Sequence, residues 1–239
     1  VPRVTLGGST DKRRTPRESG GCRLIHDGWM AKHEHHEPST DDMGGEFWDA
    51  LYSERPTIWS GEPNAQLVAE VLPLSPGSAL DVGCGEGADA VWLARRGWNV
   101  TAVYISAVAI ERAREHAAQA AVDIAFVLQD LLTTPPPPAS YDLVSAQFFQ
   151  LADPERSIFM RGLGAAVRPG GQLLVVGHRL TPAMNPTRVD RFFTPDEITA
   201  LFSADDWVSE VSESRERTAL HHGEMADLTD AVVRLRRRD

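Results

Sequence analysis

Residues 79–104 read ALDVGCGEGADAVWLARRGWNVTAVY, and this stretch decides the fold. A short apolar segment, ALDV, runs into three alternating glycines, after which a helical segment and a second apolar segment follow. Glycines at such a turn let the backbone bend sharply and approach a ligand closely. The order strand, glycine turn, helix and strand predicts the first unit of a parallel α/β sheet.

The same alternation continues along the rest of the chain. After residue 104, helices are expected at residues 107–121, 154–167 and 195–203, and strands at residues 123–130, 141–148 and 172–178. Two alternating segments, residues 207–220 and 227–238, surround His221 and predict an antiparallel hairpin. We therefore predict an α/β fold with a doubly wound, mostly parallel seven-stranded sheet, Rossmann-like, that ends in an antiparallel C-terminal hairpin.

The first forty residues differ in composition from the rest. Residues 1–40 are polar and rich in Gly and Pro, so we predict a disordered N-terminal extension followed by a single domain over residues 41–239. Met30 opens a segment that reads like a natural start, and a start at either Val1 or Met30 stays open. The HEHHE segment at residues 33–37 lacks a second ligand cluster, so we predict no metal site.

Composition excludes several functional classes. A formal charge of −10 and a pI near 5.3 argue against a nucleic-acid or anionic-membrane partner. No apolar run approaches the roughly 18–20 residues of a membrane span, and the N-terminus lacks the apolar core of a signal peptide. Cys22 and Cys84 do not suggest a disulfide framework. We expect a cytoplasmic protein, and the oligomeric state stays open.

Asp81 separates two interpretations of the glycine turn. The spacing Gly83-x-Gly85-x-x-Ala88 also fits a dinucleotide fingerprint. A carboxylate at this turn would repel a pyrophosphate, whereas it suits a ligand with a cationic ammonium or sulfonium end. The alternative role for Asp81 is structural, as an acceptor for the amides of the turn. A nicotinamide-dependent oxidoreductase therefore remains the less favoured interpretation.

Residues 80–106, LDVGCGEGADAVWLARRGWNVTAVYIS, resemble the cofactor motif of class I S-adenosylmethionine-dependent methyltransferases. The aromatic segment FWDALYSERPTIWSGEPN, residues 47–64, is similar to the N-terminal segment that folds over the cofactor in small bacterial enzymes of the tellurite-resistance and thiopurine-methyltransferase-like type. The resemblance covers roughly residues 45–239. It implies methyl transfer from S-adenosyl-L-methionine to a small-molecule acceptor, whose identity the sequence does not reveal.

The resemblance also implies roles for single residues. Asp81 would hold the methionine amino group, Asp130 would bond the adenine amino group, and Gln147 would lie near the reactive methyl. His178, just past the fifth strand, is a candidate base if the acceptor carries a proton that must leave; an ordinary strand-end histidine is the alternative. The implied cofactor-binding set is Trp59, Asp81, Gly83, Cys84, Gly85, Tyr104, Ile105, Asp130, Leu131 and Gln147.

Tyr104 departs from the family pattern. The methyltransferases that this chain resembles usually carry Asp or Glu at the end of the second strand, bonded to both ribose hydroxyls. A tyrosine offers one neutral hydroxyl and a larger ring, so charge-assisted bonds of about 1.5–3 kcal/mol give way to a neutral bond of about 0.5–1.5 kcal/mol. We predict cofactor binding weaker by roughly tenfold or more. A non-catalytic or weakened cofactor-binding homologue therefore stays an alternative, and the sequence does not say whether Tyr104 is natural or introduced.

The wall of the acceptor site is expected from the aromatic segment and from residues 179–193, RLTPAMNPTRVDRFF. This loop mixes apolar side chains with Arg179, Arg188 and Arg191. Such a mixture suits a small apolar or anionic acceptor, although solvated loop arginines are the commoner case.

Overall fold

The computed structural model describes residues 44–149, 151–179, 189–221 and 224–239. The predicted N-terminal extension, the HEHHE segment, His222 and residues 180–188 of the acceptor loop lie outside these ranges. In the part of the chain that is described, no helix is long and apolar enough to span a membrane.

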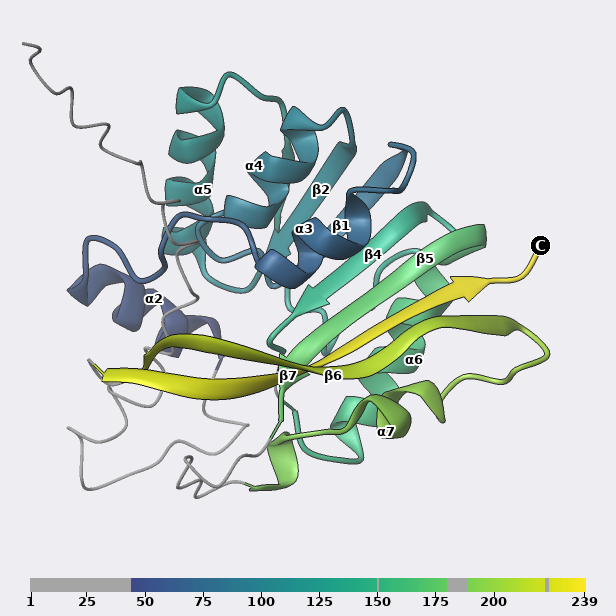
Figure 1. The fold of residues 1–239 in the computed structure, drawn as a ribbon. Helices are drawn as coiled ribbons and strands as arrows, with labels where there is room; N and C mark the ends of the chain where they lie inside the picture. The colour runs from purple at the N-terminus through teal and green to yellow at the C-terminus, as the bar shows by residue number, and fades with distance from the viewer. Residues whose placement is uncertain (1–43, 150, 180–188, 222–223) are drawn as a thin grey trace, which may run out of the picture.

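The predicted fold class is confirmed by a seven-stranded sheet with the strand order β3-β2-β1-β4-β5-β7-β6 (Figure 1). The first five strands of the chain pair in parallel, and β7 runs antiparallel to both β5 and β6. The chain order reverses between β1 and β4, the place where open α/β sheets bind ligands. The strands are β1 Ser78–Val82, β2 Asn99–Tyr104, β3 Ala125–Leu128, β4 Tyr141–Gln147, β5 Val167–His178, β6 Trp207–His221 and β7 Glu224–Arg237.

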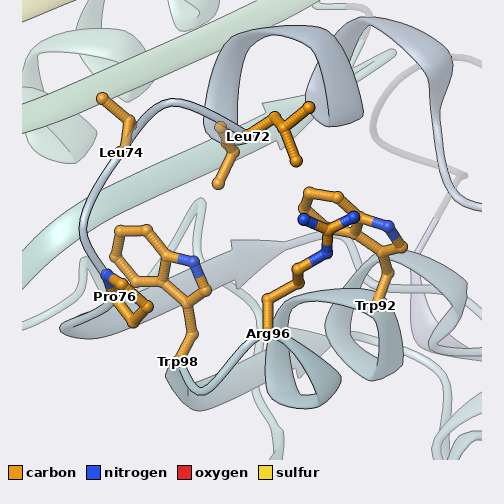
Figure 2. A pocket seen from close by; sticks show the side chains of 7 residues that line it. Leu72, Leu74, Pro76, Trp92, Arg96 and Trp98 are labelled. Carbon is orange, nitrogen blue, oxygen red and sulfur yellow. The ribbon is translucent and has the colours of Figure 1, made fainter.

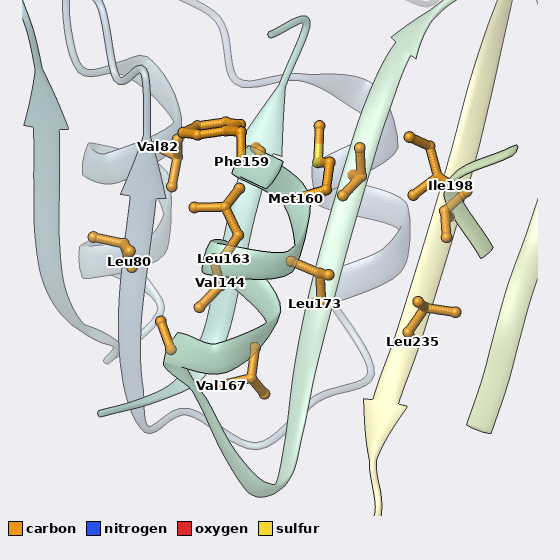
Figure 3. Close-up of a cluster of buried hydrophobic side chains, with 14 of the residues drawn as sticks. Leu80, Val82, Val144, Phe159, Met160, Leu163, Val167, Leu173, Ile198 and Leu235 are labelled. Carbon is orange, nitrogen blue, oxygen red and sulfur yellow. The ribbon is translucent and has the colours of Figure 1, made fainter. Parts of the chain in front are cut away.

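Helices cover both faces of the sheet. The helices are α2 Gly45–Glu54, α3 Ala65–Val71, α4 Ala88–Arg95, α5 Ala107–Gln119, α6 Glu155–Ala166 and α7 Pro195–Thr199. On the α3–α4 face, Leu67 of α3 and Leu93 of α4 pack with Leu174 of β5 in one buried cluster. On the opposite face, α6 lies against the sheet (Figure 3), and α7 contributes Ile198 to the same cluster. The glycine turn therefore joins β1 to a helix of the α3–α4 face.

The core beneath α6 is the larger of the two sheet-facing clusters. Met160 and Leu163 of α6 are fully buried and pack with Val144 of β4 and Leu173 of β5, as Figure 3 shows. Ile198 of α7 adds a further fully buried side chain. Burial of a side chain of this size stabilises the fold by about 1.5–3 kcal/mol relative to its exposure.

Several element boundaries differ from the sequence-based expectation. Thr194 and Glu197 form a capping box at the start of α7, but the helix ends at Thr199, before the expected residue 203, because Leu201 and Phe202 donate to oxygens only three residues back. Strand β5 begins at Val167, five residues early, because Val167 pairs with Tyr141 across a register shift in β4. Such a shift carries no periodic signal in the sequence.

Gly87 provides a test of the packing between α4 and α5. Its φ of +85° is left-handed, and an added Cβ would lie 3.0 Å from the Cβ of Ala113. We predict that Gly87→Ala lowers the free energy of unfolding by backbone strain of about 1–2 kcal/mol and overpacking of about 1–3 kcal/mol. The control is Gly61→Ala, where φ is +75° and no atom lies within 4 Å, so only the strain applies. Equal losses in chemical denaturation of the two variants would contradict the packing argument.

Candidate cofactor and acceptor site

Five strands bring polar or aromatic side chains to one edge of the α3–α4 face. Side chains alternate along a strand, so residues two positions apart share a face. Ala79, Ala102, Leu143, Val176 and Val232 mark that face, because all of them belong to the cluster under α3 and α4. The side chains at the ligand-binding edge of the same face are Tyr104, Asp81, Gln147, His178 and Asp230.

The glycine turn between β1 and α4 is held against the end of β2. The backbone N–H groups of Gly83 and Cys84 donate to the carbonyl oxygen of Val103, at 2.9 and 3.1 Å. Gly83, Gly85 and Gly87 have φ values of +74°, +51° and +85°, which side-chain-bearing residues rarely adopt. The residue type at these positions therefore follows from the backbone path.

Asp81 lies behind this turn and is 2% exposed. It accepts a hydrogen bond from the backbone N–H of Ala90, while its Oδ2 atom is buried and has no hydrogen-bond partner in the described part of the chain. Burial raises the pKa of Asp81 well above its usual value, and the charge of Asp89 raises it further. A cationic group beside Oδ2 would relieve both penalties.

Asp89 in the first turn of α4 is the second carboxyl group of this region. It is half-buried and accepts a hydrogen bond from the backbone N–H of Asn64 at 2.6 Å. Burial raises the pKa of Asp89 to about 6, against the lowering effect of that bond. The sequence analysis did not single out Asp89.

Burial and the charge of Asp81 also raise the pKa of the Cys84 thiol, which therefore stays protonated.

Glu86 joins the aromatic segment to the glycine turn. Its carboxylate accepts hydrogen bonds from the backbone N–H groups of Ile58 and Trp59, at 3.3 and 3.1 Å, and pairs with Arg112 of α5 at 2.9 Å. Arg112 also donates to the carbonyl oxygens of Tyr52 and Arg55. The two side chains together fix residues 52–59 over the turn.

Helix α2 docks at the start of α5. Asp49 accepts hydrogen bonds from the Ser106 hydroxyl and from the backbone N–H of Val108, where a negative charge suits the helix N-terminus. An added Cβ at Gly45 would lie 2.9 Å from the carbonyl oxygen of Ile105, so only glycine permits this approach. Ile105 thus contacts α2 in this structure.

Tyr104 belongs to an aromatic cluster with Trp48, Tyr52 and Trp59. The Trp59 Nε1–H donates to the Tyr52 hydroxyl at 2.8 Å, and that hydroxyl donates to the Tyr104 hydroxyl at 3.4 Å. The rings of Tyr52 and Tyr104 meet edge to face, with centroids 5.9 Å apart. Burial raises the pKa of both hydroxyls, that of Tyr52 to about 12. Tyr104 therefore stays neutral and packs where the family usually has a carboxylate.

The remaining predicted residues lie on either side of this cluster. Asp130 accepts from the backbone N–H of Leu132 at 2.9 Å, and Leu131 is buried in the cluster beneath α6. Gln147 donates to Ser145 at 2.8 Å, while its Oε1 atom is buried without a hydrogen-bond partner among the described residues. The adenine and methyl-end roles of these residues stay predictions.

His178 contacts a residue that the sequence analysis missed. Its Nδ1 atom lies 3.3 Å from Oδ1 of Asp230, and the Arg217 Nε–H donates to the other oxygen at 2.7 Å. Burial opposes ionisation of Asp230, but the bonds from His178 and Arg217 outweigh it and lower its pKa. The ring of Phe148 stacks on His178 with centroids 4.2 Å apart. An acidic residue on the inward face of a strand was the signal that could have revealed Asp230.

The pocket in Figure 2 lies at the opposite, amino edge of the sheet. It measures about 220 Å³, and its lining includes Trp92, Trp98 and Arg96, whose guanidinium lies 4.8 Å from the centre of the Trp92 ring. Pro76 and Trp98 stand just before β1 and β2, so the strands separate this pocket from the glycine turn. It takes no part in the site described above.

Comparison with known proteins points to the same part of the chain. Residues 79–171 match the family described as a methyltransferase domain. The matched part is similar to a methyltransferase domain and includes the glycine turn. Methyltransferase GfsG of Streptomyces halstedii is 32% identical over 140 residues, which cover 57% of this chain and 50% of that protein. The 27-O-demethylrifamycin SV methyltransferase of Amycolatopsis mediterranei is 36% identical over 120 residues, covering 48% and 44%. The chain thus spans about half the length of these relatives.

Solved structures share the fold of this chain. TehB from Haemophilus influenzae has a TM-score of 0.62 and 21% identity, covering 80% of this chain and 66% of that one. The [4+2]-cyclase SpnF has a TM-score of 0.62 and 18% identity, covering 84% and 97%. At such identities the likeness concerns the fold alone, and a fold hosts more than one reaction.

The raised pKa of Asp89 predicts a pH dependence of stability. The folded state favours the protonated carboxyl, so the free energy of unfolding should fall as pH rises between the ordinary pKa of 3.8 and about 6. Asp89→Asn keeps an acceptor for Asn64 and should flatten the curve in that window. Thermal denaturation across the window measures the difference, and parallel curves for the two proteins would contradict the prediction.

Tyr104→Asp should separate packing from ligand binding. Loss of the ring should lower the melting temperature of the ligand-free protein, whereas a carboxylate should tighten S-adenosylhomocysteine binding roughly tenfold. Tyr104→Phe is the control, because it keeps the ring and removes only the hydroxyl. Calorimetric titration measures the binding, and thermal denaturation measures the stability. Weaker binding by the Asp variant would mean that Tyr104 itself contacts the ligand.

Proposed function

We propose that this chain transfers the methyl group of S-adenosyl-L-methionine to a small-molecule acceptor. The observation that carries the proposal is the buried Oδ2 atom of Asp81, which lacks a hydrogen-bond partner within the described residues and lies behind the glycine turn of a methyltransferase domain. An anionic oxygen in that position requires a cationic partner, and the amino group of the cofactor supplies one.

The donors and acceptors at the site fit this cofactor. Asp81 would hold the amino group, and the small residues of the glycine turn would leave room for the methionine part. Trp59 Nε1 lies 3.1 Å from the position of a Cβ at Gly85, so the aromatic segment would cover this end. Tyr104 would present one hydroxyl to the ribose. When bound, the cofactor supplies a methyl group on an already activated sulfonium.

The chain would contribute position, exclusion of water and, for some acceptors, a base. The aromatic segment held by Glu86 would cover the site and keep water out. His178 would accept a proton from an acceptor that must lose one, while Asp230 fixes the orientation of its ring through Nδ1. Cytoplasmic location and the lack of nucleic-acid or membrane partners stay predictions of the sequence.

Asp81→Asn tests the proposal directly. It keeps the shape and removes the charge, so S-adenosylhomocysteine binding should weaken by about 1.5–3 kcal/mol, roughly 10–100-fold. An analogue without the amino group should lose much less. Calorimetry measures both ligands. Equal losses would support a purely structural Asp81.

A second candidate is a cofactor-binding homologue without turnover. The observation that favours it is the aromatic cluster around Tyr104, which would occupy the space expected for the ribose. Binding of S-adenosylhomocysteine without methyl transfer to a panel of thiols, phenols and small carboxylic acids would support this candidate. Binding of NADH in place of S-adenosylhomocysteine would instead favour an oxidoreductase.

A further inference from the structure

Arg217 of β6 is incompletely paired at the edge where the acceptor would bind. Its Nε–H donates to Asp230 at 2.7 Å. Both terminal nitrogens, Nη1 and Nη2, are buried, and neither has a hydrogen-bond partner in the part of the chain that the structure describes. A buried donor without a hydrogen-bond partner lowers the stability of the folded state. The two terminal nitrogens of a guanidinium can donate two parallel hydrogen bonds to one carboxylate.

The neighbouring arginine on the same strand shows the contrast. Arg215 lies two residues earlier, on the same side of β6, and its nitrogens contact Gln66, Glu70 and Glu213. The α3–α4 face therefore supplies partners for Arg215, whereas the described residues supply none for the terminal nitrogens of Arg217. The described residues therefore leave two donors of Arg217 available to a ligand.

The surroundings of Arg217 favour a planar ligand next to the reacting centre. The guanidinium carbon lies 5.8 Å from the centre of the Phe148 ring, and that ring stacks on His178. Phe148 directly follows Gln147 and has a φ of +56°, an uncommon conformation that only specific surroundings maintain. Arg217, Phe148 and His178 thus form one cluster beside the expected methyl end.

We propose that Arg217 binds the carboxylate of the methyl acceptor, so that the acceptor is a small organic acid methylated at another atom. This inference rests on the proposed function. Asp230 would keep its bonds to Arg217 Nε and His178 Nδ1, and the acceptor carboxylate would take Nη1 and Nη2. Both carboxylate oxygens would then be engaged, which leaves a different atom of the acceptor to receive the methyl group.

Benzoate and its neutral isostere benzamide are suitable probes. Calorimetry uses the full chain, with and without saturating S-adenosylhomocysteine. Benzoate should bind at least tenfold more tightly than benzamide. Arg217→Gln should reduce benzoate binding to the level of benzamide. Arg215→Gln is the matched control and should change benzoate affinity less than twofold. S-adenosylhomocysteine affinity should stay within twofold in both variants.

Arg217→Lys covers the case in which the Gln variant does not fold. It keeps a positive charge beside Asp230 but loses the two parallel donors, so benzoate should bind several-fold more weakly than to the parent protein. The inference would be overturned if the parent protein bound benzoate and benzamide equally or did not bind benzoate at all. It would also be overturned if inorganic phosphate bound more tightly than benzoate, or if Arg215→Gln lost as much benzoate affinity as Arg217→Gln. Failure of S-adenosylhomocysteine to bind the parent protein would count against the proposed function instead.

Discussion

The carboxylate of Glu86 connects the three parts on which the site depends. It stands within the glycine turn, accepts the backbone N–H groups of Ile58 and Trp59, and pairs with Arg112 of α5. Glu86 is 5% exposed, so these partners must balance a buried charge. The same contacts that neutralise Glu86 therefore hold the aromatic segment over the turn.

The electrostatics of the site divide into two regions. Around the glycine turn, burial and the charge of Asp89 raise the cost of ionising Asp81, and the described residues leave one oxygen of Asp81 unpaired. At the other end, Arg217 and His178 stabilise the charge of Asp230. The atoms left without a partner there among the described residues include two hydrogen-bond donors, Nη1 and Nη2 of Arg217. A cation at the first region and an anion at the second would complement both.

Tyr104 links the fold to the question of activity. Its ring completes a cluster with Tyr52 and Trp48, so a residue that is expected to weaken ribose recognition also stabilises the docking of α2. The bulky ring can be read from the sequence, but its neighbours come from a segment about fifty residues earlier. The role of Tyr104 therefore depends on how its ring packs against α2.

The sequence by itself determined the order of elements, the glycine turn and the position of Asp81, because each follows from local periodicity and backbone conformation. Local sequence also accounts for the capping box at Thr194 and the N-cap at Ser106, since each involves residues at most three positions apart. Only the tertiary structure decided the partners of His178 and Arg217 and the effect of the Asp89 charge on the pKa of Asp81. Those features arise where segments distant in the sequence or on different elements become neighbours, and single-chain periodicity carries no information about which side chains then meet.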